Sequence, residues 1–151
     1  MDTVEIKIEV SCPGQETDED KTRGSIKINN KVIEKIDLTG KETKELTMNV
    51  YLEDETHTLE IEHSYSENPK TALVINKIVI EDIDIGVIAY EGEYRPIYPE
   101  PWYSDETAAG RPPKEIIGKE QDGSACLFMG WEGTYKLQFS TPLYEWLLQK
   151  I

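Results

Sequence analysis

A two-residue alternation of apolar and polar side chains recurs from residue 4 to residue 85, and it constrains the fold more than any other feature. It is clearest from Val4 to Val10, where branched residues occupy every second position. On a pleated strand this spacing puts the apolar side chains on one face. Similar segments return about every ten residues without a convincing helix between them, which is typical of an antiparallel β-sandwich. The sequence therefore predicts an all-β fold.

The clearest local prediction is a hairpin between residues 24–29 and 31–38. The two segments meet at Asn29-Asn30, a pair that tolerates the positive φ of a tight turn. Further strands are expected at 46–52, 57–64, 72–80 with a short extension to 85, 124–131 and 134–140. The last two should form a hairpin at Glu132-Gly133, and a short C-terminal helix should follow, with Thr141 as its N-cap and Pro142 as its first residue.

The segment from about 89 to 123 interrupts this pattern. Tyrosines and tryptophan alternate there with Pro96, Pro99 and Pro101. Because proline lacks a backbone N–H, this stretch cannot occupy the interior of a sheet. We expect a long ordered loop inserted before the last strands.

The aromatic residues of this insertion are the best candidates for binding a ligand. Sugars place C–H faces on aromatic rings while carboxylates bind their hydroxyls, which favours glycan contact. The candidate ligand-binding residues are Tyr94, Tyr98, Trp102, Tyr103 and Glu100, with Glu93 and Asp105 as further carboxylates. In the alternative, the rings lie on the sandwich as a lid. Trp131 and Trp146 follow strand and helix patterns, and we expect them in the core.

Length and charge narrow the classes of protein further. A chain of 151 residues is expected to form a single domain, residues 1–151. Its net charge of −14 repels phosphate backbones and anionic bilayers, which disfavours nucleic acid and membranes as partners. Neither a membrane span nor a secretory signal is expected, because no apolar run reaches about 20 residues and the N-terminus lacks a basic start.

Catalytic and metal-binding signals are weak. The common nucleotide-binding, hydrolase and zinc-protease motifs are absent, so no catalytic residue is assigned. On one strand His57 and His63 would lie about 20 Å apart, too far to share a metal ion. Calcium is the one cofactor that the composition allows. Its candidate loops are Asp18-Glu19-Asp20, Glu53-Asp54-Glu55 and Glu81-Asp82-Asp84, with a solvated acidic surface as the alternative for each.

The only two cysteines, Cys12 and Cys126, are too few for a disulfide framework. Two partly buried thiols are expected, with one disulfide between them as the alternative.

The order of segments from Val4 to Ile85 resembles the jelly-roll carbohydrate-binding modules of the calcium-dependent xylan-binding type. The resemblance rests on the strand that contains His57-Thr58-Leu59 and on the asparagine-bearing break that leads into a long apolar strand, Asn68 to Ile80. It implies a jelly-roll sandwich, glycan binding and calcium. The family's loop carries Gly-Asp-Arg-Asn-like residues at a place where this chain has Asn68-Pro69-Lys70-Thr71.

The second half, with the run Tyr94 to Trp102 and the ending Gly133 to Pro142, looks like small proteins of marine tailed phages. Together the two resemblances imply a non-catalytic binding or structural module of a phage virion or tail. Its partners would be a glycan or neighbouring virion subunits, with a homo-oligomer left open, and its location the virion or the host cytoplasm. A free-standing carbohydrate-binding protein and a small glycan-active enzyme with paired carboxylates are the alternatives.

Overall fold

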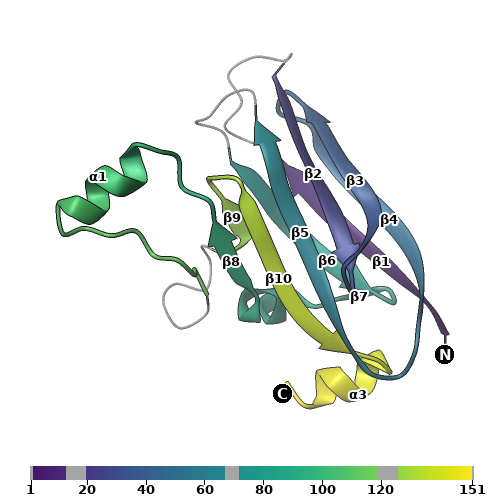
Figure 1. Ribbon diagram of the computed structural model, residues 1–151. Helices are drawn as coiled ribbons and strands as arrows, with labels where there is room; N and C mark the ends of the chain where they lie inside the picture. The colour runs from purple at the N-terminus through teal and green to yellow at the C-terminus, as the bar shows by residue number, and fades with distance from the viewer. Residues whose placement is uncertain (1, 13–19, 67–71, 119–125, 151) are drawn as a thin grey trace.

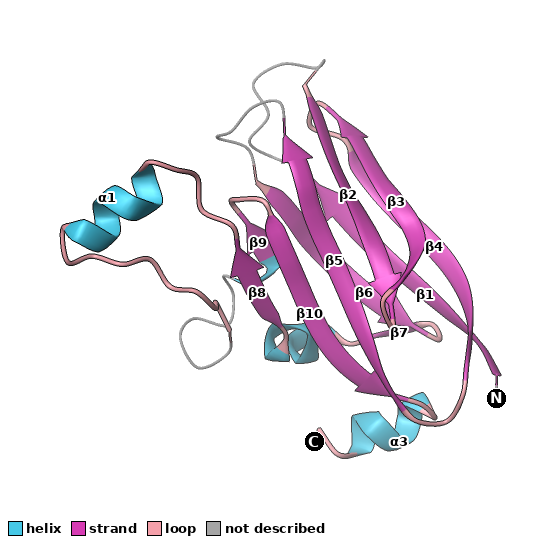
Figure 2. Cartoon of the chain, in the orientation of Figure 1, coloured by secondary structure: helices cyan, strands magenta, loops and turns pink. Residues whose placement is uncertain are grey.

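The computed structural model describes residues 2–12, 20–66, 72–118 and 126–150, and two antiparallel sheets face each other in it (Figure 1, Figure 2). The expected all-β fold, an antiparallel jelly-roll sandwich, is confirmed. None of the helices in the described part of the chain has the length and apolar character that a membrane span requires.

Within the described residues, each sheet contains five strands. The first sheet has the order β4 (Thr43–Leu52), β1 (Asp2–Ser11), β6 (Leu73–Ile80) and β7 (Ile83–Asp84), and β9 (Phe128–Met129) also pairs with β6. The second has the order β3 (Lys31–Thr39), β2 (Lys21–Ile28), β5 (Thr56–Ser66), β10 (Gly133–Ser140) and β8 (Glu93–Pro96).

The core lies between the inner faces of the two sheets. In β1 the alternating residues Val4, Ile6, Ile8 and Val10 are all buried, as their spacing predicts. Tyr135, Leu137 and Phe139 of β10 are likewise buried, and both sets belong to one hydrophobic cluster. In both sheets, the two-residue alternation in the sequence therefore predicts correctly which side chains are buried.

The hairpin at Asn29-Asn30 is confirmed. β2 and β3 pair antiparallel, and the two asparagines between them have φ values of 52° and 69°. Positive φ at both central residues is the geometry of a type I′ turn, which matches the twist of the strands. The turn between β6 and β7 repeats this geometry with φ values of 52° at Glu81 and 64° at Asp82.

The insertion contains more regular structure than the expected loop. It begins with a 3₁₀ helix, η1 (Gly86–Glu91), continues through β8 and includes a short helix, α1 (Trp102–Ala108). The proline argument is correct for sheet interiors, because β8 is an edge strand and Pro96 is its last residue. The helix is missed because none of its residues is buried, so it has no apolar stripe to read.

The predicted strand 124–131 and its hairpin are wrong. Within the described part of this segment only Phe128 and Met129 are in a strand, and they pair with β6 of the first sheet. β10 pairs with β5 and β8 of the second sheet. Glu132-Gly133 therefore lies where the chain crosses between sheets, so the two strands cannot pair with each other.

The expected C-terminal helix is present as α3 (Leu143–Leu148). It begins one residue later than predicted, because Pro142 is the N-cap and has an extended ψ of 138°. Trp146 on this helix is buried against Phe139 of β10, as expected for a core residue.

Candidate functional site

The insertion carries α1 out to the side of the sandwich, at the left of Figure 1. Four aromatic rings join it to the start of β10 and form what we call the aromatic cluster: Tyr98, Trp102, Tyr103 and Trp131. Trp102 and Tyr103 belong to α1, whereas Trp131 lies two residues before β10. The cluster therefore connects two segments that are distant in sequence.

Tyr98 is the centre of this cluster. Its ring centroid lies 4.8 Å from that of Trp131, 5.6 Å from that of Trp102 and 5.8 Å from that of Tyr103. Its hydroxyl donates a hydrogen bond of 2.5 Å to the Lys114 carbonyl. Partial burial raises the pKa of the Tyr98 hydroxyl, and the neighbouring Tyr103 adds to the shift. The ring is therefore fixed at its rim and packed on several sides.

The two indoles of the cluster remain open to solvent. Trp102 and Trp131 stack with a centroid distance of 5.8 Å and an interplanar angle of 25°. Their exposed fractions are 40% and 37%. Large aromatic side chains that are held by neighbours and still exposed are typical of contact surfaces.

The backbone of Trp131 is held from beneath by two buried side chains. The Tyr94 hydroxyl donates to the Trp131 carbonyl and accepts a hydrogen bond of 3.0 Å from the Trp131 N–H. His63 Nδ1 lies 3.2 Å from the same carbonyl, so Nδ1 carries the proton that it donates. Among the described residues, His63 Nε2 has no hydrogen-bond partner. Burial lowers the pKa of His63, although the carbonyls of Trp131 and Met129 and the charge of Glu132 oppose the shift.

The structure places the five predicted ligand-binding residues in three different settings. Tyr98, Trp102 and Tyr103 come together in the aromatic cluster. Glu100 is exposed just before α1, and its carboxylate accepts a 2.5 Å hydrogen bond from the Ser104 hydroxyl. Tyr94 is only 1% exposed, so it supports Trp131 and cannot present its ring to a ligand in solution.

Sequence reasoning missed Trp131, which it assigned to the core. The signal that could have identified it is local: Gly130 and the pair Glu132-Gly133 enclose the tryptophan in residues that are typical of turns. A tryptophan in a turn is more often exposed than one in a strand that alternates with polar residues.

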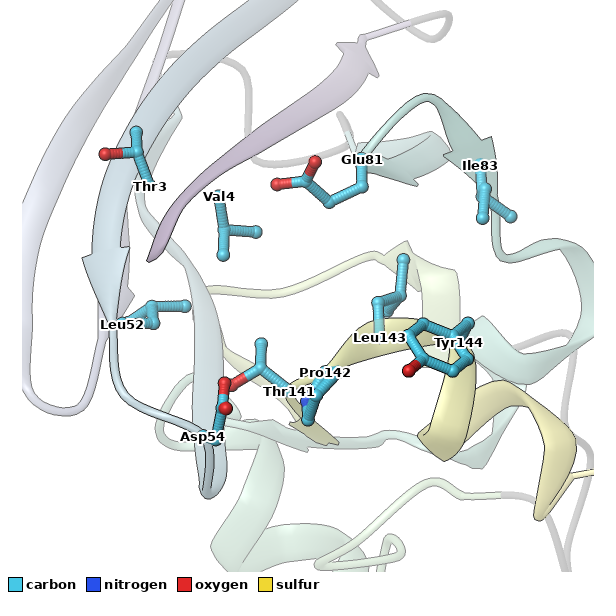
Figure 3. Close-up of a pocket in the computed structure, with 10 residues that line it drawn as sticks. All are labelled: Thr3, Val4, Leu52, Asp54, Glu81, Ile83, Thr141, Pro142, Leu143 and Tyr144. Atoms are coloured by element: carbon cyan, nitrogen blue, oxygen red, sulfur yellow. The ribbon is translucent and has the colours of Figure 1, made fainter. Parts of the chain in front are cut away.

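A pocket of about 450 Å³ lies at the opposite end of β10 from the aromatic cluster (Figure 3). It is enclosed by the start of β1, the β4–β5 turn, the β6–β7 turn and the beginning of α3. Its lining residues are Thr3, Val4, Leu52, Asp54, Glu81, Ile83, Thr141, Pro142, Leu143 and Tyr144. The sequence analysis included Asp54 and Glu81 in candidate calcium loops but did not predict a pocket.

The described residues do not fit a calcium site. Across residues 2–12, 20–66, 72–118 and 126–150, no group of three or more His, Cys, Asp and Glu side chains converges. Glu81 Oε1 accepts the Glu5 N–H at 3.1 Å, and Asp84 Oδ1 accepts the Gly86 N–H at 2.8 Å. These two carboxylates therefore stabilise backbone near their own turn. In the candidate loop Asp18-Glu19-Asp20, Asp18 and Glu19 lie outside the described residues.

His57 and the two cysteines are buried and contribute to the structure of the sandwich. His57 is buried at the end of β5, where Nδ1 accepts from the Asn29 amide at 3.0 Å and Nε2 donates to the Glu53 carbonyl at 2.8 Å. Cys12 and Cys126 are both buried, and neither takes part in a disulfide. Burial raises the pKa of the Cys126 thiol to about 11, which disfavours the reactive thiolate.

Two solved structures resemble this fold. One is described as "vCBM60 in complex with galactobiose"; it has a TM-score of 0.56 and 8% identity, over 87% of this chain and 95% of that chain. The other is the selenomethionine form of vCBM60, described with a circular permutation linking two families of calcium-dependent carbohydrate-binding modules. Its TM-score is 0.55 at 8% identity, over 88% of each chain. No protein-family model matches the sequence, and no curated protein matches it significantly.

At this level of identity the likeness concerns the fold. The chain has a β-sandwich similar to that of these carbohydrate-binding modules, and this fold agrees with the expectation from its first half. Neither structure bears on the tailed-phage resemblance of the second half.

Proposed function

We propose that this protein is a non-catalytic carbohydrate-binding module and that it contacts a glycan through the exposed indoles of Trp102 and Trp131. One observation carries the proposal: the two rings are stacked on each other and held by Tyr98, yet each remains more than a third exposed. The likeness of the fold to carbohydrate-binding modules supports the same class of ligand.

The chemistry of the cluster suits a sugar ring. The C–H face of a pyranose packs on an aromatic face, and the gain is larger when the aromatic ring is already immobile, because less side-chain entropy is lost on binding. Glu100 is exposed beside α1 and retains acceptor capacity beyond its bond from Ser104, so it can bind sugar hydroxyls. The ligand contacts assigned here are therefore Trp102, Trp131, Tyr103 and Glu100, with Tyr98 and Tyr94 as supports.

The competing interpretation is that the cluster only anchors the insertion to the sandwich. The two interpretations differ in what a conservative substitution does. If the rings are only an anchor, replacing Trp102 by alanine changes the stability of the insertion but no binding. If they contact a glycan, Trp102→Phe retains part of the binding that Trp102→Ala removes.

Affinity gel electrophoresis against a panel of soluble polysaccharides, including galactan and xylan, tests the proposal. We expect at least one polysaccharide to retard the protein. Trp102→Ala and Trp131→Ala should each weaken that binding about tenfold, which corresponds to about 1.4 kcal/mol. Tyr51→Ala is the matched control, because Tyr51 is 63% exposed but lies on β4 of the other sheet. Retardation that both tryptophan variants leave unchanged would exclude the cluster as the contact surface.

The gels should be run with calcium and with a chelator. One of the similar structures is described among calcium-dependent carbohydrate-binding modules, so retardation that the chelator abolishes would support calcium as a cofactor, and retardation that it leaves unchanged would count against calcium.

Association with a phage particle remains a prediction from the resemblance of the second half. Mass spectrometry of purified particles tests it separately from glycan binding.

A further inference from the structure

The pocket in Figure 3 is lined by both apolar and polar residues, and its charged residues are all acidic. Val4, Leu52 and Leu143 are buried core residues and form its apolar depth. The carboxylates of Asp54 and Glu81 approach from opposite sides, one from the β4–β5 turn and the other from the β6–β7 turn. None of the ten residues that line the pocket is a lysine, an arginine or a histidine.

We propose that this pocket binds a primary ammonium group carried on a short aliphatic chain. This proposal is separate from glycan contact at the aromatic cluster. The pocket lies next to the C-terminal end of β10, at Ser140, whereas the cluster lies next to its N-terminal end, at Gly133. The two sites are therefore at opposite ends of β10, and they share no residue.

The two charged groups of the lining favour a positively charged donor, whereas the hydroxyls of Thr3 and Tyr144 can either donate or accept. The Thr141 hydroxyl already donates to the Glu53 carbonyl at 2.7 Å, so its proton is not available to a ligand. Each carboxylate can only accept hydrogen bonds when it is ionised. An ammonium group offers three donors and a positive charge, and hydrogen bonds between ionised partners are about twice as strong as neutral ones. An anion would meet two like charges here.

The shape of the pocket explains why the ammonium should carry an aliphatic chain. Its volume of about 450 Å³ falls within the usual size of small-molecule sites. The apolar depth would take the methylenes of the chain. The exposed ring of Tyr144 lies beside Leu143 at the edge of the pocket in Figure 3 and adds an aromatic side chain to the lining.

Contacts within the protein hold the walls of the pocket. Glu81 accepts the N–H of Glu5, which links the β6–β7 turn to β1. Leu143 is buried in the core at the start of α3. A site whose walls are fixed in advance loses little entropy when it binds.

The same ammonium chemistry can come from two sources, a free amine or the lysine side chain of a peptide. Isothermal titration of the full chain with a series from ethylammonium to pentylammonium tests the shared chemistry. Acetyl-lysine-methylamide, blocked at its α-amino and α-carboxyl groups, then tests the peptide source. The acetyl-norleucine-methylamide analogue, which lacks the ammonium, is its control.

We expect affinity to rise about fourfold for each methylene until the depth is filled, the equivalent of about 0.8 kcal/mol per buried CH₂. The alcohols of equal chain length should bind at least tenfold more weakly. Asp54→Asn and Glu81→Gln should each weaken ammonium binding about tenfold, and Glu81→Gln keeps an oxygen that can accept the Glu5 N–H. Glu45→Gln is the matched control, because Glu45 is exposed on β4 and does not line the pocket.

Equal affinity for the alkylammonium and the alcohol would overturn the proposal, and so would ammonium binding that neither pocket variant weakens. Binding of the free amines but not of the lysine derivative assigns the site to a free amine. Binding of both shows that the site also accepts the lysine side chain of a peptide. Polysaccharide retardation measured on Asp54→Asn keeps the two proposals apart, because it should equal that of the unmodified chain.

Discussion

Gly92 lies directly before β8, and the structure leaves no room there for a side chain. An added Cβ would lie 2.5 Å from Cε2, 2.6 Å from Cζ and 2.7 Å from the hydroxyl oxygen of Tyr135. Gly92 has φ −71° and ψ 170°, a backbone conformation that alanine adopts without strain. Gly92→Ala therefore tests packing alone. Tyr135 cannot move without cost, because it is completely buried and its hydroxyl donates a 2.6 Å hydrogen bond to the Ala89 carbonyl.

The magnitude follows from two contributions. Forcing an extra methyl into a packed core costs about 1–3 kcal/mol. Displacing the Tyr135 ring takes its buried hydroxyl away from the Ala89 carbonyl and leaves that hydroxyl without an acceptor, at a cost of about 1–3 kcal/mol. The two costs do not simply add. If the Tyr135 ring keeps its hydrogen bond, the steric strain is larger, and if the ring moves away, the strain falls but the hydrogen bond is lost. We therefore expect Gly92→Ala to lower the free energy of unfolding by about 3 kcal/mol.

Urea denaturation followed by tryptophan fluorescence measures this change. Gly118→Ala is the matched control, because its nearest atoms would be 3.6 Å and 3.8 Å from the added Cβ, which is ordinary contact. It should change stability by less than about 0.5 kcal/mol. In a Tyr135→Leu background the alanine at position 92 should cost less than about 1 kcal/mol, because the smaller side chain gives it space. A Gly92→Ala protein as stable as the control would refute the reasoning.

Three further predictions concern buried polar groups. Because burial holds the pKa of His63 below its ordinary value of 6.5, the unfolded chain takes up a proton first; the free energy of unfolding should fall as the pH drops below 6.5, and His63→Gln should flatten that part of a urea-midpoint profile between pH 7.5 and 5. Tyr94→Phe removes both hydrogen bonds to the Trp131 backbone and should cost about 1–3 kcal/mol in the same assay. Cys12 and Cys126, both buried with raised pKa values, should react with a thiol reagent at pH 8 only after unfolding; rapid labelling of the folded chain would contradict their burial.

The sequence predicts the sandwich well because period-two burial is a local signal with a global consequence. Each branched residue from Val4 to Val10 must face the core if its neighbours face solvent, so strand identity and strand face follow together. The Asn29-Asn30 turn is equally local, since two consecutive positive φ angles restrict the residues that can occupy it. Which strand pairs with which is not local, and the predicted hairpin at Glu132-Gly133 is wrong for that reason.

The candidate site was predictable only in its residue types. The concentration of aromatic residues in the insertion identified Tyr98, Trp102 and Tyr103, which the structure does bring together. Trp131 joins them because the chain changes sheets just before β10, an event that leaves no periodicity in the sequence. Tyr94 was misjudged for a related reason: it lies in β8, where pairing with β10 turns its ring toward the interior.

The aromatic cluster also explains how α1 can exist so far from the core. A helix of seven residues with none of them buried has no stability of its own, since isolated helices shorter than about 12 residues are marginal in water. Its attachment comes from Trp102 and Tyr103 packing on Tyr98 and Trp131. The rings that would contact a glycan are thus the same rings that order the insertion. A ligand that packs on the exposed indoles would therefore also stabilise α1, since any ligand that binds only the ordered state raises its population.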